Sequence, residues 1–171
     1  MGFCKIKDVE PEDVESLIYL CILPERKDDK LFIDGIDMKK VWASKSLEKF
    51  GSIAKLAYVN SEPVGLIQYQ PKPEEKLIEI TCIFVPNKQY HRKGIGKALL
   101  NALIEDAKKP KEFFNNEPPL ALVTWAFSVP GYYPQNEFYL KMGFKKVRED
   151  DPFLLYYPLK EGYVYHPKKE K

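Results

Sequence analysis

The segment Leu77–Lys109 constrains the fold of this chain more than any other part. It opens with Leu77–Val85, a nearly continuous run of apolar and β-branched residues that is typical of a central strand buried on both faces. Pro86 ends this run, and a basic loop with two glycines follows. The helix expected over Gly94–Lys109 has one apolar stripe, which consists of Ile95, Ala98, Leu99, Ala102, Leu103 and Ala107. A strand, a glycine loop and an amphipathic helix in this order predict a layered α/β structure.

The loop His91–Lys97 combines glycines, positive charge and the start of a helix. The first amides of a helix have no acceptor within the helix, and the helix dipole favours negative charge at that end. Gly94 and Gly96 would let a bulky diphosphate approach the main chain. Positive charge comes from His91, Arg92, Lys93 and Lys97. We therefore predict a phosphate-binding site at this loop.

Two common nucleotide-binding motifs fail here at defining positions. A P-loop requires a glycine where this chain has His91, and Ser or Thr where it has Ala98. A dinucleotide fingerprint requires a third glycine where this chain has Leu99. A nucleotide-binding domain is therefore weakly supported. A turn whose glycines only permit tight packing stays open as an alternative at this point.

The remaining patterns predict further strands and helices around this segment. Strands are expected at Phe3–Lys7, Ile53–Val59, Val64–Gln70, Leu120–Phe127, Phe144–Arg148 and Phe153–Tyr157. Helices are expected at Pro11–Ile22, from Asp37 to Phe50 and at Gln135–Met142, with a left-handed cap at Gly51 and a cap at Gly143. No internal repeat and no long linker divide the sequence, so we expect a single domain over residues 1–171.

Composition and charge exclude several function classes. The chain has 27 Lys and Arg against 25 Asp and Glu, and a protein that binds nucleic acid by neutralising phosphates usually carries a larger excess. Cys4, Cys21 and Cys82 are too few and too irregularly spaced for a disulfide framework or a closed zinc site. The start of the chain turns acidic too early for a signal peptide, and no apolar run reaches the about 20 residues that span a bilayer. We expect a cytoplasmic protein with no metal and neither a nucleic-acid nor a membrane partner.

Two segments of the sequence together resemble the GNAT N-acetyltransferase superfamily. In that family a central strand leads to a (Gln/Arg)-x-x-Gly-x-(Gly/Ala) loop that binds the pyrophosphate of coenzyme A, and His91–Gly96 matches this loop with His91 in the Gln/Arg place. Glu137–Phe144 is similar to the family segment Phe-Tyr-x-Lys-x-Gly-Phe, which closes the cofactor cleft. The resemblance covers about residues 50–157 and is thinner before them.

The resemblance implies an α/β (α+β) fold with a GNAT-like mixed, mostly antiparallel sheet flanked by helices on both faces. Residues 1–50 would form the N-terminal strand and acceptor-side helices, 51–160 the sheet and coenzyme A-binding core, and 161–171 a fraying tail. The implied reaction is direct transfer of an acetyl group from acetyl-CoA to a primary amine in a ternary complex. A non-catalytic acyl-CoA-binding regulatory module is the alternative.

The resemblance also implies roles for individual residues. Tyr139 matches the tyrosine that protonates the leaving thiolate in many members, and Glu79 lies where some members place the base. Packing is the alternative for Tyr139, and a solvated or salt-bridged carboxylate is the alternative for Glu79. The acyl and pantetheine groups are expected at Ile83, Phe84 and Val85, where a main-chain amide would bind the thioester carbonyl. The phosphates are expected at His91, Arg92, Lys93, Gly94, Ile95, Gly96 and Lys97.

The acceptor remains the least defined partner. Near-neutral charge does not choose between a small-molecule amine and a protein amine. A homodimer is suggested only by the habit of the family. An aromatic cluster lies on and after the strand expected at Leu120–Phe127 and is a candidate for the acceptor pocket, with core packing as the alternative: Trp125, Phe127, Tyr132 and Tyr133.

Overall fold

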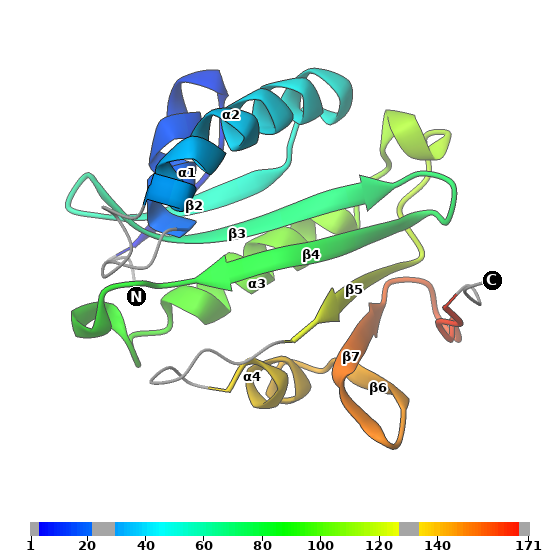
Figure 1. Ribbon diagram of the computed structural model, residues 1–171. Coiled ribbons are helices and arrows are strands. Elements are labelled where there is room, and N and C mark those ends of the chain that lie inside the picture. Colours follow the sequence, from blue (N-terminus) through cyan, green and yellow to red (C-terminus); the bar gives the residue numbers. More distant parts are fainter. Residues whose placement is uncertain (1–3, 22–29, 127–133, 168–171) are drawn as a thin grey trace. The chain divides into compact units, whose positions relative to one another are not determined.

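The computed structural model describes residues 4–21, 30–126 and 134–167 of the chain (Figure 1). Its strands are β1 (Lys5–Asp8), β2 (Ala54–Val59), β3 (Glu62–Lys72), β4 (Leu77–Phe84), β5 (Ala121–Trp125), β6 (Lys145–Arg148) and β7 (Asp151–Pro158). Its α-helices are α1 (Val14–Cys21), α2 (Lys30–Phe50), α3 (Ile95–Ala107) and α4 (Gln135–Lys141). Short 3-10 turns lie at Pro11–Asp13, Lys88–Tyr90 and Glu112–Phe114.

The described strands form a mixed sheet in the order β1-β2-β3-β4-β5-β7-β6. β4 and β5 are parallel neighbours, in the register Leu77 to Ala121. The pairs β1–β2, β2–β3, β5–β7 and β6–β7 are antiparallel. Parallel neighbours need a long crossover, and here the segment between β4 and β5 contains α3. The prediction of a mixed, mostly antiparallel sheet is confirmed.

The chain divides into two compact units. The first comprises Met1–Tyr69 and Cys82–Leu103, and the second comprises Gln70–Thr81 and Ile104–Lys171. β3, β4 and α3 each pass from one unit into the other. Each unit has an apolar core of its own.

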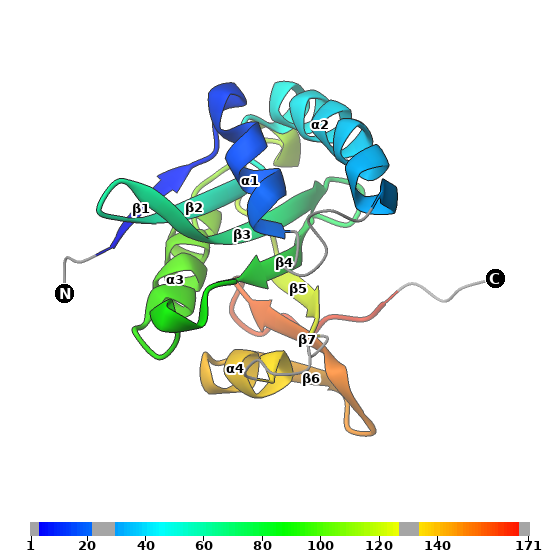
Figure 2. The same ribbon diagram turned by 60° about the vertical axis from the view of Figure 1, so that its left-hand side comes forward.

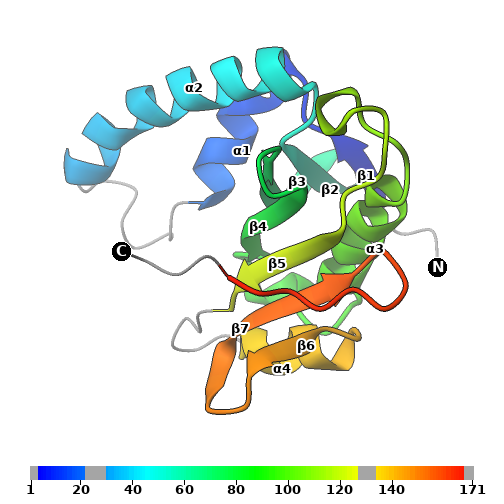
Figure 3. The same cartoon turned by 90° about the vertical axis from the view of Figure 1, so that its right-hand side faces the viewer.

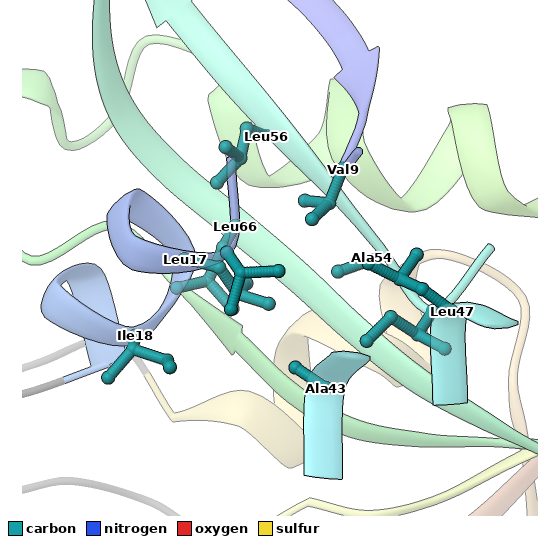
Figure 4. Close-up of a cluster of buried hydrophobic side chains, with 10 residues drawn as sticks. Val9, Leu17, Ile18, Ala43, Leu47, Ala54, Leu56 and Leu66 are labelled. Carbon is teal, nitrogen blue, oxygen red and sulfur yellow. The ribbon is translucent and has the colours of Figure 1, made fainter. Parts of the chain in front are cut away.

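The core of the first unit forms where α1 and α2 cover β2 and β3. Apolar residues at helical spacing place Leu17 and Ile18 on the inner side of α1, and Leu47 lies one turn after Ala43 on α2. Figure 4 shows these side chains pointing toward Leu66 and its neighbours on the strands. Removing Leu17, which is 1% exposed, from water stabilises this layer by about 2 kcal/mol.

The opposite face of the same strands carries α3. Successive residues of a strand point to opposite faces, so Leu66 enters the core with α1 and α2 while Gly65 faces α3. Figure 3 shows α1 and α2 on one side of β2 and β3 and α3 on the other. The prediction of helices on both faces is confirmed.

The second unit is built on β5, β7 and β6, with α4 packed against β7. Figure 2 shows α4 beside β6 and β7. Gly143 ends the α4 segment with φ at +100°, and a Cβ atom there would lie 3.3 Å from the Tyr157 ring. The expected cap at Gly143 is confirmed. The expected left-handed cap is also confirmed at Gly51, which has φ at +79° and whose amide donates to the Leu47 carbonyl at 2.7 Å.

Several predicted boundaries are wrong. α2 begins at Lys30 rather than Asp37, because Gly35 lies inside the helix without ending it. β3 begins two residues early, at Glu62, because Asn60 and Ser61 both have positive φ and form a two-residue turn. Its far end extends through Pro71, whose fixed φ is compatible with an extended strand.

Two predictions about burial are also wrong. β4 is not buried on both faces throughout, since Thr81 is exposed and Glu79 is only partly buried. The described part of the tail does not fray, because Tyr163 and Tyr165 pack against the core of the second unit. Burial raises the pKa of both phenols.

Some expected features lie outside the described residues, namely Phe127, Tyr132, Tyr133 and the tail beyond residue 167. Trp125 is described and is 48% exposed at the end of β5. None of the helices in the described ranges has the length and apolar character to cross a bilayer.

The packing of α3 on β3 generates the first testable prediction. A Cβ atom at Gly65 would approach three side chains, Val85 Cγ2 at 3.1 Å, Ile95 Cγ2 at 3.3 Å and Leu99 Cδ1 at 3.4 Å. Gly65→Val would overpack this contact, and we expect the free energy of unfolding in urea to fall by about 1–3 kcal/mol. Glu62→Val, at an exposed position of the same strand, should change it by less than about 0.5 kcal/mol. Equal effects of both variants would show that α3 does not depend on this contact.

Candidate functional site

The loop between β4 and α3 has a defined conformation. Asn87 starts its 3-10 turn, where the Asn87 side chain accepts from the Gln89 amide at 3.0 Å and the Asn87 carbonyl accepts from the Tyr90 amide at 3.0 Å. His91 follows, and its Nε2 atom lies 2.6 Å from the carbonyl oxygen of Val85. The loop therefore returns to the end of β4 before it enters α3.

The turn from the loop into the helix uses two left-handed residues. Gly94 has φ at +79°, and among the described residues other than Gly94 and its two chain neighbours no heavy atom lies within 4 Å of the position that a Cβ atom would take. Arg92 has φ at +60°, a conformation that costs a non-glycine residue about 1 kcal/mol. Such backbone conformations concentrate at ligand sites. The space beside Gly94 leaves the main chain open to a ligand.

The first turn of α3 presents main-chain donors. The first bond of the helical ladder runs from the Ala98 amide to the Gly94 carbonyl at 2.9 Å. The amides of Ile95, Gly96 and Lys97 therefore precede the first amide that donates an i→i−4 bond. The Ile95 side chain is 1% exposed and faces Gly65, so this residue can offer an anion its amide alone.

Positive side chains surround these amides. Arg92, Lys93 and Lys97 are all exposed. Within the described part of the chain, none of these three side chains takes part in a salt bridge. Together with the helix dipole, they create a positive potential that suits a diphosphate. This is the chemistry that the sequence predicts for the loop.

The residues at the end of β4 pack in the interior of the first unit. Ile83 is 7% exposed, and Phe84 packs partly buried against the cluster that contains Leu66. The Val85 side chain contacts Gly65, while its carbonyl accepts from His91. Packing thus fixes the backbone of the segment that is predicted to contact the acyl and pantetheine groups.

Glu79 lies in the second unit, where it forms a salt bridge with Lys72. The Lys72 Nζ atom is 3.0 Å from Glu79 Oε1, and the side chains are 36% and 24% exposed. The hydrogen bond to Glu79 raises the pKa of Lys72. Tyr165 lies within electrostatic reach of both charges. The salt-bridge alternative is therefore realised in this structure, and the role of base stays a prediction.

Tyr139 also lies in the second unit, on α4. It is 1% exposed, and its ring meets Phe138 edge-on at a centroid distance of 5.4 Å and Phe144 at 4.9 Å. This packing holds the phenol ring in one orientation. The role of acid stays a prediction.

Sequence reasoning missed three features of the site. A lone glycine in a strand signals close backbone approach, and that signal at Gly65 was available. The Lys72–Glu79 pair depends on strand register, and the His91–Val85 bond depends on how the loop turns back. No sequence pattern gave either contact.

Among the described residues, one cluster of three carboxylates is close enough together to hold a metal ion. Oxygen atoms of Glu10, Glu12 and Asp13 lie within 4.8 Å of one another. Asp13 is already engaged, because Lys7 Nζ lies 3.1 Å from its Oδ2 and the Glu10 amide donates to it at 3.0 Å. The group has a structural explanation in these bonds.

Comparison with known proteins agrees with this geometry. A family model described as an acetyltransferase (GNAT) domain matches residues 51–146, more than half of the chain. No curated protein sequence matches at a significant level.

Solved structures are similar in fold. An N-acetyltransferase, PaiA, from Thermoplasma acidophilum in complex with coenzyme A is 17% identical over 91% of this chain and 98% of its own, with a TM-score of 0.63. A GNAT-family acetyltransferase from Staphylococcus aureus is 20% identical, and the match covers 92% of this chain and 99% of that protein, with a TM-score of 0.66. N-acetylglutamate synthase from Neisseria gonorrhoeae, complexed with coenzyme A and L-arginine, is 17% identical. The match covers 92% of this chain but 34% of the synthase, with a TM-score of 0.57.

The left-handed conformation of Gly94 generates a prediction that concerns the backbone alone. Gly94→Ala should lower the free energy of unfolding by about 1 kcal/mol, because alanine is strained at this φ although there is room for its methyl group. Gly94→Asn should cost less, because asparagine tolerates the left-handed region better than alanine. Equal stability of the parent and Gly94→Ala in chemical denaturation would mean that the turn adopts another conformation.

Proposed function

Because the chain belongs to the GNAT acetyltransferase family, we propose that it transfers an acetyl group from acetyl-CoA to a primary amine by direct attack in a ternary complex. The observation that carries this proposal is the loop, where unpaired helix amides, an open Gly94 and exposed cations coincide. Two proteins of similar fold have structures that hold coenzyme A, which supports the same ligand for this loop.

In the proposed complex the loop holds the pyrophosphate of acetyl-CoA. The amides of Ile95, Gly96 and Lys97 donate to the phosphate oxygens, and the exposed side chains of Arg92 and Lys93 add long-range attraction. Amide bonds give a fixed geometry, whereas exposed side chains are screened by salt. Binding should therefore weaken with ionic strength but persist.

The reaction needs a neutral amine, a positioned thioester and a proton for the departing thiolate. The amine nitrogen attacks the carbonyl carbon, and the oxyanion that forms is stabilised by a main-chain amide at the end of β4. The carbon–sulfur bond then breaks and releases the thiolate of coenzyme A. Ile83, Phe84 and Val85 contact the acyl and pantetheine groups in this proposal, and their packed backbone limits the loss of order on binding.

Tyr139 is the proposed acid that protonates the thiolate. In water a phenol has a pKa near 10 and a thiol a pKa near 8.5, so the transfer is uphill by only about 2 kcal/mol. A ring held by Phe138 and Phe144 loses little further freedom when the hydroxyl aligns with the sulfur.

Glu79 is the proposed base that takes the proton of the attacking amine, directly or through water. Lys72 does not compete for this role, because its raised pKa keeps the amine protonated at neutral pH. The Lys72 Nζ atom lies 3.0 Å from Glu79 Oε1, and this salt bridge holds the carboxylate in place.

Thiol release in the presence of acetyl-CoA and a library of small-molecule and peptide amines tests the proposed activity. We expect coenzyme A and acetyl-CoA, but neither ATP nor NAD, to raise the melting temperature, because a ligand of the native state stabilises it. Binding without thiol release for any amine would indicate the non-catalytic acyl-CoA-binding module instead. Stabilisation by ATP or NAD alone would contradict the proposal.

The first prediction of the proposal concerns Gly96. Gly96→Val places a branched side chain in the first turn of α3, where the pyrophosphate approaches the main chain. The affinity for coenzyme A should fall at least about tenfold, or about 1.4 kcal/mol, in calorimetry. Asn101→Val introduces the same residue at an exposed position of α3 beyond the first turn and should bind normally. A folded Gly96→Val variant with unchanged affinity would exclude this loop from the cofactor site.

The second prediction concerns the Tyr139 hydroxyl. Tyr139→Phe keeps the ring and its contacts with Phe138 and Phe144. If the hydroxyl acts only as the thiolate leaves, the single-turnover rate should fall by roughly 10²–10⁴ while acetyl-CoA binding stays nearly intact. Tyr156→Phe, at another buried tyrosine of the same unit, should leave the rate within about twofold. If Tyr139→Phe has the same single-turnover rate as the parent protein, Tyr139 only packs and is not the acid.

A further inference from the structure

We infer that His91 is a positioning residue for acetyl-CoA: its imidazole N–H ties the phosphate loop back to the carbonyl of Val85 and so fixes the amides that follow. This inference rests on the proposed function. The match to the family loop places a histidine where Gln or Arg is usual, and the structure gives that histidine a specific bond.

The bond spans six residues and joins the His91 side chain to the main chain just after β4. The Val85 carbonyl follows directly on β4, and the Val85 side chain is packed at Gly65. His91 stands at the other end of the loop, just before the left-handed Arg92. The Nε2–oxygen distance of 2.6 Å is slightly shorter than the about 2.7–3.2 Å that is usual for an N–H···O bond, and the contact is partly buried.

The direction of the bond follows from the chemistry of its partners. A carbonyl oxygen only accepts, so His91 Nε2 carries the hydrogen and donates it. Neutral His91 is therefore the tautomer with hydrogen on Nε2. The imidazolium also carries hydrogen on Nε2, so the bond to Val85 is compatible with both charge states.

Further hydrogen bonds order the interior of the loop. The turn at Lys88–Tyr90 is closed by Asn87 and by the His91 amide, which donates to the Lys88 carbonyl at 3.1 Å. These contacts are local, within four residues of the chain. The His91 side chain supplies a longer link, from the end of the loop back to the residue that follows β4.

The link should act on affinity rather than on the chemical step. A phosphate loop that is ordered before binding loses less conformational freedom when the ligand arrives. His91 touches no reacting atom in the proposed mechanism. Loss of the bond should therefore raise the Kd of coenzyme A and the KM of acetyl-CoA, while kcat at saturation stays the same.

Two substitutions separate the donor from the ring. His91→Phe keeps an aromatic ring of similar shape but has no N–H, whereas His91→Gln has a side-chain amide that can donate to the Val85 carbonyl. We expect His91→Phe to raise Kd and KM about three- to tenfold and His91→Gln to stay within about twofold of the parent. His166→Phe and His166→Gln, at the exposed second histidine of the chain, are the matched controls and should change nothing.

Nitrogen NMR of the ligand-free protein tests the bond without coenzyme A. We expect the neutral His91 ring to be the Nε2–H tautomer with a coupling across the hydrogen bond to the Val85 carbonyl. The Nδ1–H tautomer would overturn the inference even if the protein binds coenzyme A. If the expected tautomer and coupling are present but no CoA species binds, the proposed function fails while the bond stands.

The binding data complete the test. The inference that the His91 N–H orders the loop would be overturned if the Kd of coenzyme A is unchanged in His91→Phe. It would also be overturned if His91→Phe and His91→Gln lose the same affinity for coenzyme A. If His91→Phe does not fold, the comparison of His91→Gln with the parent and the NMR result still decide the question. A fall in kcat with unchanged KM would also contradict a positioning role.

Discussion

The contact between α3 and β3 at Gly65 is the constraint on which the candidate site depends. Helix axes and strands normally stay apart by the width of their side chains, and here the absent side chain of Gly65 lets Ile95 and Leu99 approach the strand. Ile95 is the first residue of α3, so burying its side chain fixes where the helix starts. The same packing that stabilises the first unit therefore places the main-chain donors of the loop.

Buried and exposed residues alternate over a few consecutive positions of that loop. The Ile95 side chain faces the core, while Gly94 and Lys97 face solvent. An anion can thus meet amides held by the core and charges that remain solvated until it arrives. Helix geometry leaves the first amides of a helix without an acceptor inside the helix, so in the proposed site the donors are in place before an anion binds. This arrangement gives a chain with a net charge of only +2 a locally positive potential at the start of α3.

Local patterns allowed much of this structure to be predicted from the sequence. The strand, glycine loop and helix around Gly94 were predicted from residue type and order, as was the left-handed cap at Gly51. The sequence did not predict the early start of α2, because a glycine inside a helix is usually unfavourable but was tolerated at Gly35. The Lys72–Glu79 pair and the His91–Val85 bond were not predictable, since both depend on where the chain returns in space.

Amide chemical shifts measured during a titration with coenzyme A test the central claim most directly. The account predicts that the largest changes fall on the amides of Ile95, Gly96 and Lys97 and that they saturate together. ATP at the same concentration should produce only small, unsaturated shifts, because it shares the phosphates but not the pantetheine. Saturating changes confined to other parts of the chain, with the α3 amides unmoved, would show that the loop is a packing turn and would contradict the account.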